Sequence, residues 1–161
     1  MDTKGLAREA LVIIGQYSPE GFSTKRLTEL YGTAETNGKW RILETLSKRS
    51  DCPTEIVLKL ALDYSGEIGM TVLRVAIQPT LTSMTLPDLL INLSRPWCDA
   101  KQKQKAYDLD NALRYEIIDV RLPRLPIDQL LNISFWEDPE VVKAVKGYLK
   151  DRAGELRELA K

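Results

Sequence analysis

The chain has 161 residues, carries 23 Lys and Arg against 23 Asp and Glu, and contains no histidine. The balanced charge excludes a bulk electrostatic attraction to nucleic acid or to an anionic membrane. The absence of histidine excludes hydrolysis with a histidine base, histidine-ligated zinc or iron, and an imidazole pH switch. A chain of this length buries enough surface to fold without a metal or a disulfide, so we expect a single domain over residues 1–161 and no cofactor.

The two cysteines indicate a reducing compartment. Cys52 and Cys98 are far apart and fit no metal-binding spacing, so we expect both to be reduced, with a disulfide only if the chain is secreted. The apolar run over residues 11–14 is too short for a signal peptide, and no run approaches the roughly 20 apolar residues of a membrane span. We therefore expect a soluble, cytoplasmic protein that does not bind a membrane.

Residues 1–50 are expected to form a helical segment that caps the rest of the chain. Apolar side chains recur at three- and four-residue steps over residues 3–17, which predicts an amphipathic helix. Ser23 fits the N-cap of a short helix that stops at Gly32. A polar loop over residues 33–38 then precedes a third helix.

Three later stretches repeat one plan, in which a proline is followed by an acid, an apolar ridge and a small residue. The prolines are Pro53, Pro87 and Pro126, and they are 34 and 39 residues apart. A period of this size is typical of stacked two-helix repeats. Proline suits the first turn of a helix, and the acid suits the positive end of the helix dipole. We therefore predict an all-α fold of about four stacked helix pairs, with the repeats over residues 51–161.

Each proline-led helix is expected to be followed by a return helix. Pro79 should end the first of these, because proline interrupts a helix interior. The second should run from about Asp99 to Val120. The third, after Pro139, can continue through Leu159.

The repeats over residues 53–151 resemble the HEAT-like α-solenoids, especially their leucine-rich-repeat-variant form. The resemblance rests on the phrase Pro-x-x-apolar-Leu-x-Leu-Ala/Ser, a short acidic break and a Val-rich second helix. The Asp-x-x-Val-Arg phrase of such repeats is present only in weakened form, over residues 138–143. The two unclustered cysteines also lack the four ligands of the iron–sulfur cluster that some members carry. The resemblance implies a scaffold or adaptor whose open, curved surface holds a protein partner or sometimes nucleic acid.

Two tryptophans occupy matching places between paired helices. Trp97 and Trp136 could anchor a protein partner, because tryptophan is enriched in interface hot spots. They could equally fill the gap between stacked units. Tyr64 stands in the same place in the first unit, which favours the packing role.

Two groups of lysines are candidate partner contacts. Lys101 and Lys105 share one helical face and could contact phosphate, although a solvated helix explains them as well. Lys143, Lys146 and Lys150 share a face of the last return helix. In HEAT-like folds the second helices line the concave side, so these lysines are expected to face an acidic protein or a phosphate backbone there. An ordinary charged exterior is the alternative.

Residues 20–50 also resemble a helix-turn-helix core, in which the third helix would enter the major groove. The basic residues of this nucleic-acid-binding alternative are Lys25, Arg26, Lys39 and Arg41. Two features count against it: the loop over residues 33–38 is longer than the usual turn of three or four residues, and no β-wing follows.

Catalysis has little support in the sequence. Its nine glycines form no phosphate-binding loop, and its carboxylates lie at helix starts, where capping explains them. A carboxylate beside a tryptophan, Asp99 or Asp138, could act on a damaged base in a HEAT-like cleft, but the pattern gives this role the least support. We therefore expect a non-catalytic protein-binding adaptor with no small-molecule substrate, and nucleic-acid binding through residues 20–50 as the alternative.

Overall fold

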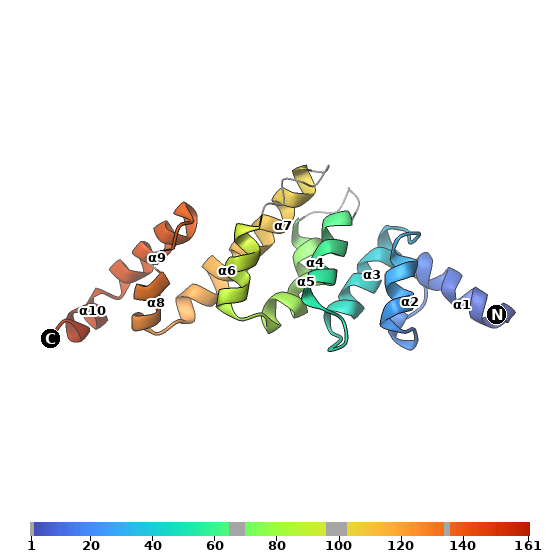
Figure 1. Cartoon of the computed structure of the whole chain (residues 1–161), viewed down its shortest axis with the longest axis horizontal. Coiled ribbons are helices and arrows are strands. Elements are labelled where there is room, and N and C mark those ends of the chain that lie inside the picture. Colours follow the sequence, from blue (N-terminus) through green and yellow to red (C-terminus); the bar gives the residue numbers. More distant parts are fainter. Residues whose placement is uncertain (1, 65–69, 96–102, 134–135) are drawn as a thin grey trace. The chain divides into compact units, whose positions relative to one another are not determined.

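The structure is a computed structural model that describes residues 2–64, 70–95, 103–133 and 136–161 (Figure 1). Within these residues there is no β-strand, so the all-α prediction is confirmed. The first elements are α1 (Thr3–Ile13), the 3-10 turn η1 (Pro19–Gly21), α2 (Thr24–Tyr31), α3 (Thr36–Ser47), α4 (Thr54–Asp63) and α5 (Met70–Ser83). The later elements are α6 (Leu86–Ser94), α7 (Lys103–Tyr115), the π-helix η3 (Glu116–Arg121), the 3-10 turn η4 (Leu122–Arg124), α8 (Ile127–Ile133), α9 (Pro139–Asp151) and α10 (Ala153–Leu159).

The described residues group into two compact units. Unit 1 takes its residues from Met1–Met84 and Pro96–Ala112, and unit 2 from Thr85–Arg95 and Leu113–Lys161.

Helix α3 forms the centre of unit 1. It packs against α1, α2, α4, α5 and η1, and its contact with α5 is the most extensive. Figure 1 shows α3 between α2 and the α4–α5 pair. Its side chains Ile42, Leu43 and Leu46 are completely buried. Each such side chain contributes about 1.5–3 kcal/mol by leaving water, so the core of unit 1 is organised around this helix.

Two glycines allow α1 to approach α3 closely. Gly15 has a φ of +75°, a left-handed conformation that favours glycine. A Cβ atom on Gly38 would meet the carbonyl oxygen of Val12 at 2.8 Å and that of Ile13 closer still. The Ile13 carbonyl also accepts a hydrogen bond from the backbone N–H of Glu35 at 2.9 Å. The end of α1 is therefore fixed directly on the start of α3.

Unit 2 is built on the π-helix η3. Helix α6 packs against η3, and α9 packs against η3, η4 and α8. The completely buried side chains include Leu89, Ile117 and Leu122. Glu116 is only 1% exposed, and its carboxylate accepts a hydrogen bond from Nε of Arg121 at 3.0 Å. The ion pair compensates the burial of this charge, which an unpaired carboxylate would make costly.

One predicted helix end is wrong. Helix α5 continues through Pro79 to Ser83, whereas the sequence predicts that Pro79 ends it. Proline deprives the carbonyl four residues earlier, on Val75, of its helical donor. Val75 is 51% exposed, so the lost hydrogen bond lies at the surface of α5 and not in the core, where it would be more costly.

Two further helix boundaries depend on tertiary contacts. Helix α3 begins at Thr36, so the turn after α2 has four residues, Gly32–Glu35, rather than the predicted six-residue loop. No side chain caps this start, and the bond from Glu35 to α1 holds it. The last return helix is interrupted at Arg152, whose guanidinium donates to the Leu125 carbonyl at 2.6 Å.

Candidate partner-binding surface

The start of α9 is held in place by Asp138. Its carboxylate caps the helix by accepting hydrogen bonds from the backbone N–H groups of Glu140 at 3.0 Å and Val141 at 3.1 Å. The same carboxylate is 2.7 Å from the Arg114 guanidinium. Burial opposes ionisation of Asp138, but the hydrogen bonds from Arg114 and from the helix outweigh it and lower the pKa of this carboxyl. Asp138 therefore anchors the start of α9 to Arg114.

One face of α9 is packed into unit 2. Val141 and Val145 are completely buried. Tyr148 lies on the same side, and its hydroxyl donates to the backbone carbonyl of Ile118 in η3 at 2.8 Å. These contacts fix the rotation of the helix, and they determine which residues face solvent.

The opposite face of α9 carries Lys143, Lys146 and Lys150, which we call the lysine stripe. All three side chains are exposed. Their spacing of three and four residues places the ammonium groups along one side of the helix. Among the residues that the structure describes, no carboxylate lies within ion-pair distance of any of them. Gly147 lies on the same face, and a Cβ added there would meet nothing within 4 Å, so the stripe borders open space.

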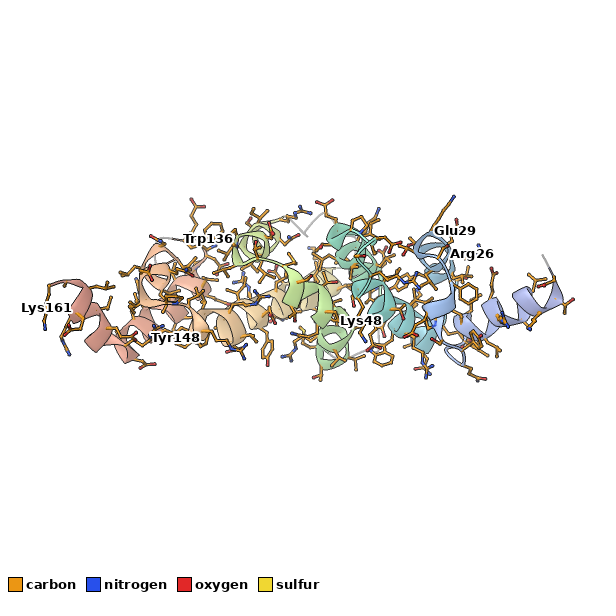
Figure 2. The ribbon with its side chains drawn as sticks, turned by 90° about the horizontal axis from the view of Figure 1, so that it is seen from below. Arg26, Glu29, Lys48, Trp136, Tyr148 and Lys161 are labelled. Carbon is orange, nitrogen blue, oxygen red and sulfur yellow. The ribbon has the colours of Figure 1, made fainter. Side chains whose placement is uncertain are left out.

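The other predicted partner contacts are divided between the two units. Trp136 is half-buried in unit 2, and its backbone N–H donates to the Ile133 carbonyl at 2.9 Å (Figure 2). Lys105 belongs to unit 1, where its ammonium group donates a hydrogen bond to the backbone carbonyl of Asp63 at 3.2 Å. This ammonium group is therefore engaged within unit 1. Trp97 and Lys101 lie outside the described residues.

The basic residues of the nucleic-acid alternative are partly neutralised. Arg26 forms ion pairs with Glu9 at 2.6 Å and with Glu29 at 2.8 Å, and Arg26 and Glu29 lie next to each other in Figure 2. The hydrogen bonds that its guanidinium donates to the carboxylates of Glu9 and Glu29 raise the pKa of Arg26. Lys39 lies over the ring of Tyr31, with its ammonium 5.3 Å from the ring centre.

Lys25 and Arg41 are exposed and form no ion pair with any described residue. The four-residue turn between α2 and α3 fits a helix-turn-helix better than the predicted loop does. However, α3 packs against five other elements, and its exposed residues are limited to Thr36, Asn37 and Arg41. A recognition helix needs a broader free face to enter a major groove.

Sequence reasoning missed a cavity of about 420 Å³ in unit 1, between η1 and α3. Trp40 and Arg41 of α3 line it with Lys48, the residue after that helix, together with Pro19 and Glu20 of η1. The signal in the sequence was the pairing of an aromatic and a cation at the start of the third helix. The turn that closes the cavity comes from residues far earlier in the chain, so no local pattern reveals it.

The part of the chain that the structure describes contains neither a cluster of metal-binding side chains nor a membrane-spanning helix. These residues contain no group of three or more Cys, Asp or Glu side chains that could hold a metal ion. Cys52 is buried, and burial raises the pKa of its thiol. None of the described helices has the length and apolar character needed to span a bilayer.

No protein family model, no curated protein and no solved structure matches this chain.

Proposed function

We propose that this chain is a non-catalytic protein-binding module and that the lysine stripe contacts an acidic segment of the partner. The observation that carries the proposal is the set of three exposed ammonium groups on one face of α9, free of ion pairs with described residues. Because the opposite face is packed, the stripe is held in a fixed orientation. A fixed row of like charges gives complementarity to an acidic surface.

The proposed architecture is a HEAT-like adaptor. Its support is that two proline-led helices each lie against the helix that follows, α4 against α5 and α8 against α9. Helix α9 is a second helix of such a pair, so in this architecture the lysine stripe lies on the partner-facing side. The absence of histidine from the sequence and its lack of a phosphate-binding glycine loop support a non-catalytic role.

A protein partner is favoured over nucleic acid by the number of free cations. The chain has no excess positive charge, and three lysines on a single helix neutralise few phosphates. In the N-terminal alternative, Arg26 and Lys39 are already engaged within the fold. The alternative therefore rests on Lys25 and Arg41.

The test measures binding of a labelled oligoglutamate peptide to the whole chain by fluorescence anisotropy. A triple variant of the lysine stripe, Lys143→Gln, Lys146→Gln and Lys150→Gln, should bind about tenfold more weakly, since each exposed ion pair contributes about 0.5 kcal/mol. The matched control replaces three exposed lysines elsewhere with glutamine, at Lys4, Lys59 and Lys103. It removes the same charge and should bind the peptide nearly as well as the natural chain.

An equal loss in both triple variants would show that only general electrostatics holds the peptide, and the stripe would lose its role. Tighter, salt-steep binding of a single-stranded or duplex oligonucleotide, weakened by Lys25→Ala and Arg41→Ala, would favour the nucleic-acid alternative instead.

A further inference from the structure

The cavity between η1 and α3 has the size and lining of a small-molecule site. Its volume of about 420 Å³ lies at the small end of the roughly 300–1,000 Å³ that ligand pockets occupy. The lining residues come from η1 and the residue before it, and from α3 and the two residues after it. All of them belong to unit 1, so the cavity is independent of the lysine stripe.

The walls of the cavity are preorganised by Arg49. Its guanidinium donates to the Glu20 carbonyl of η1 at 3.0 Å and to the Thr24 hydroxyl of α2 at 3.2 Å. The Thr24 hydroxyl in turn donates to the Asp51 carboxylate at 2.8 Å. The turn is thus tied to the end of α3, and Pro19 within it is buried. A ligand would enter a formed site and would not have to order it.

Trp40 is the aromatic residue that lines the cavity. Its indole Nε1 is buried, with no acceptor among the described residues, so this nitrogen does not make the cavity surface polar. Pro19 adds a second apolar surface. An aromatic ring of a ligand can stack against such a surface.

The cations that line the cavity are not equivalent. Lys48 is 3.5 Å from Glu44, and Arg49 is engaged with the turn. Arg41, next to Trp40 in sequence, is exposed and forms no ion pair with a described carboxylate. Glu20 is joined to Arg49, eight residues after Arg41, through its backbone carbonyl. Arg41 is therefore the cation lining the cavity that no described carboxylate neutralises and no hydrogen bond to the turn engages.

We propose that this cavity binds a small aromatic anion, with the ring against Trp40 and a carboxylate or phosphate at Arg41. A guanidinium matches the planar geometry of both anionic groups. This binding activity is separate from the protein-binding role and does not depend on it.

The test is an NMR titration of the whole ¹⁵N-labelled chain with four probes. They are 1-naphthoate, 1-naphthyl phosphate, the neutral 1-naphthamide, and inorganic phosphate, which carries no aromatic ring. Trp40→Phe assigns the Trp40 indole signal among those of the three tryptophans. One or both aromatic anions should shift that signal, and the one that binds identifies the preferred anionic group. The amide and inorganic phosphate should bind at least about tenfold more weakly, since each lacks one half of the recognition.

Three variants complete the test. Arg41→Gln should weaken the aromatic anion about tenfold, the usual scale for one charge-assisted hydrogen bond. Glu20→Gln, on the η1 wall of the same cavity, should leave the affinity unchanged or slightly improved. Arg124→Gln removes an exposed arginine in unit 2 and should have no effect.

The proposal fails if naphthamide binds as tightly as naphthoate and naphthyl phosphate. It fails equally if Arg41→Gln binds like the natural chain. The absence of any shift up to about 10 mM of either anion, where a millimolar site would be largely filled, also overturns it. Each of these results leaves the oligoglutamate experiment on the lysine stripe unaffected.

Discussion

Replacing Gly38 with alanine tests the close approach of α1 to α3. The added Cβ would lie 2.8 Å from the Val12 carbonyl oxygen and even closer to that of Ile13. Both are backbone atoms, so neither can rotate aside as the end of a long side chain would. Relief requires α1 to move away from α3, which also stretches the hydrogen bond from Glu35 to the Ile13 carbonyl.

The expected effect is a net loss of stability. Alanine improves helix propensity over glycine by about 1 kcal/mol. Overpacking a tight contact costs about 1–3 kcal/mol, and losing the backbone hydrogen bond from Glu35 to the Ile13 carbonyl costs about 1 kcal/mol more. We therefore expect Gly38→Ala to lower the free energy of unfolding by about 2 kcal/mol.

Gly147→Ala is the matched control for Gly38→Ala. Gly147 also lies inside a helix, but a Cβ there would meet nothing within 4 Å. Only the propensity gain applies, so this variant should be more stable by about 0.5–1 kcal/mol. Urea unfolding followed by far-ultraviolet circular dichroism measures both variants. If Gly38→Ala is stabilised as much as Gly147→Ala, the close contact of α1 with α3 is wrong.

Three further outcomes are expected. Asp138→Asn should lose about 1 kcal/mol at neutral pH, because a charge-assisted bond to Arg114 becomes a neutral one. Because the folded state lowers the pKa of Asp138, the natural chain keeps this contribution above the ordinary carboxyl range and loses it as the pH falls through the folded-state pKa. The urea midpoints of the two proteins should therefore converge as the solution is acidified; a constant gap would contradict this. Tyr148→Phe should lower the thermal midpoint by about 2–4 °C, since it removes one part-buried hydrogen bond worth about 1 kcal/mol; an unchanged midpoint would exclude that bond. In a Cys98→Ser background, Cys52 should react slowly with a disulfide reagent until urea unfolds the chain, because it is buried and burial raises its thiol pKa; fast reaction in the native state would contradict its burial.

The helices of the repeats were largely predictable from the sequence. Helices α4, α6 and α8 all begin next to the prolines that the repeat plan places there, because proline and a following acid are local signals of a helix start. The face shared by Lys143, Lys146 and Lys150 was predictable for the same reason, since it depends only on helical periodicity. Pro79 shows the limit of this reasoning, because its effect depends on whether water can reach a neighbouring carbonyl.

The start of α3 was not predictable, because its determinant is not local. No side chain caps Thr36, and the chain turns there because Glu35 bonds to Ile13 and Gly38 lies against the end of α1. A polar loop with a glycine near its end looks the same in sequence whether or not another helix packs on it. The cavity beside Trp40 was hidden for the same reason, since its two walls come from separate elements.

The availability of a cation is likewise set by the tertiary structure and not by helical spacing. Arg26 is matched by Glu9, 17 residues away, and Arg114 by Asp138, 24 residues away. Periodicity reaches only three or four residues, so it cannot tell a neutralised arginine from a free one. This is why the N-terminal basic residues looked as suitable for an anionic partner as the lysines of α9 did. Binding of an acidic partner should follow the cations that folding leaves unpaired, and a charge-reversal scan of exposed lysines and arginines would rank them in that order.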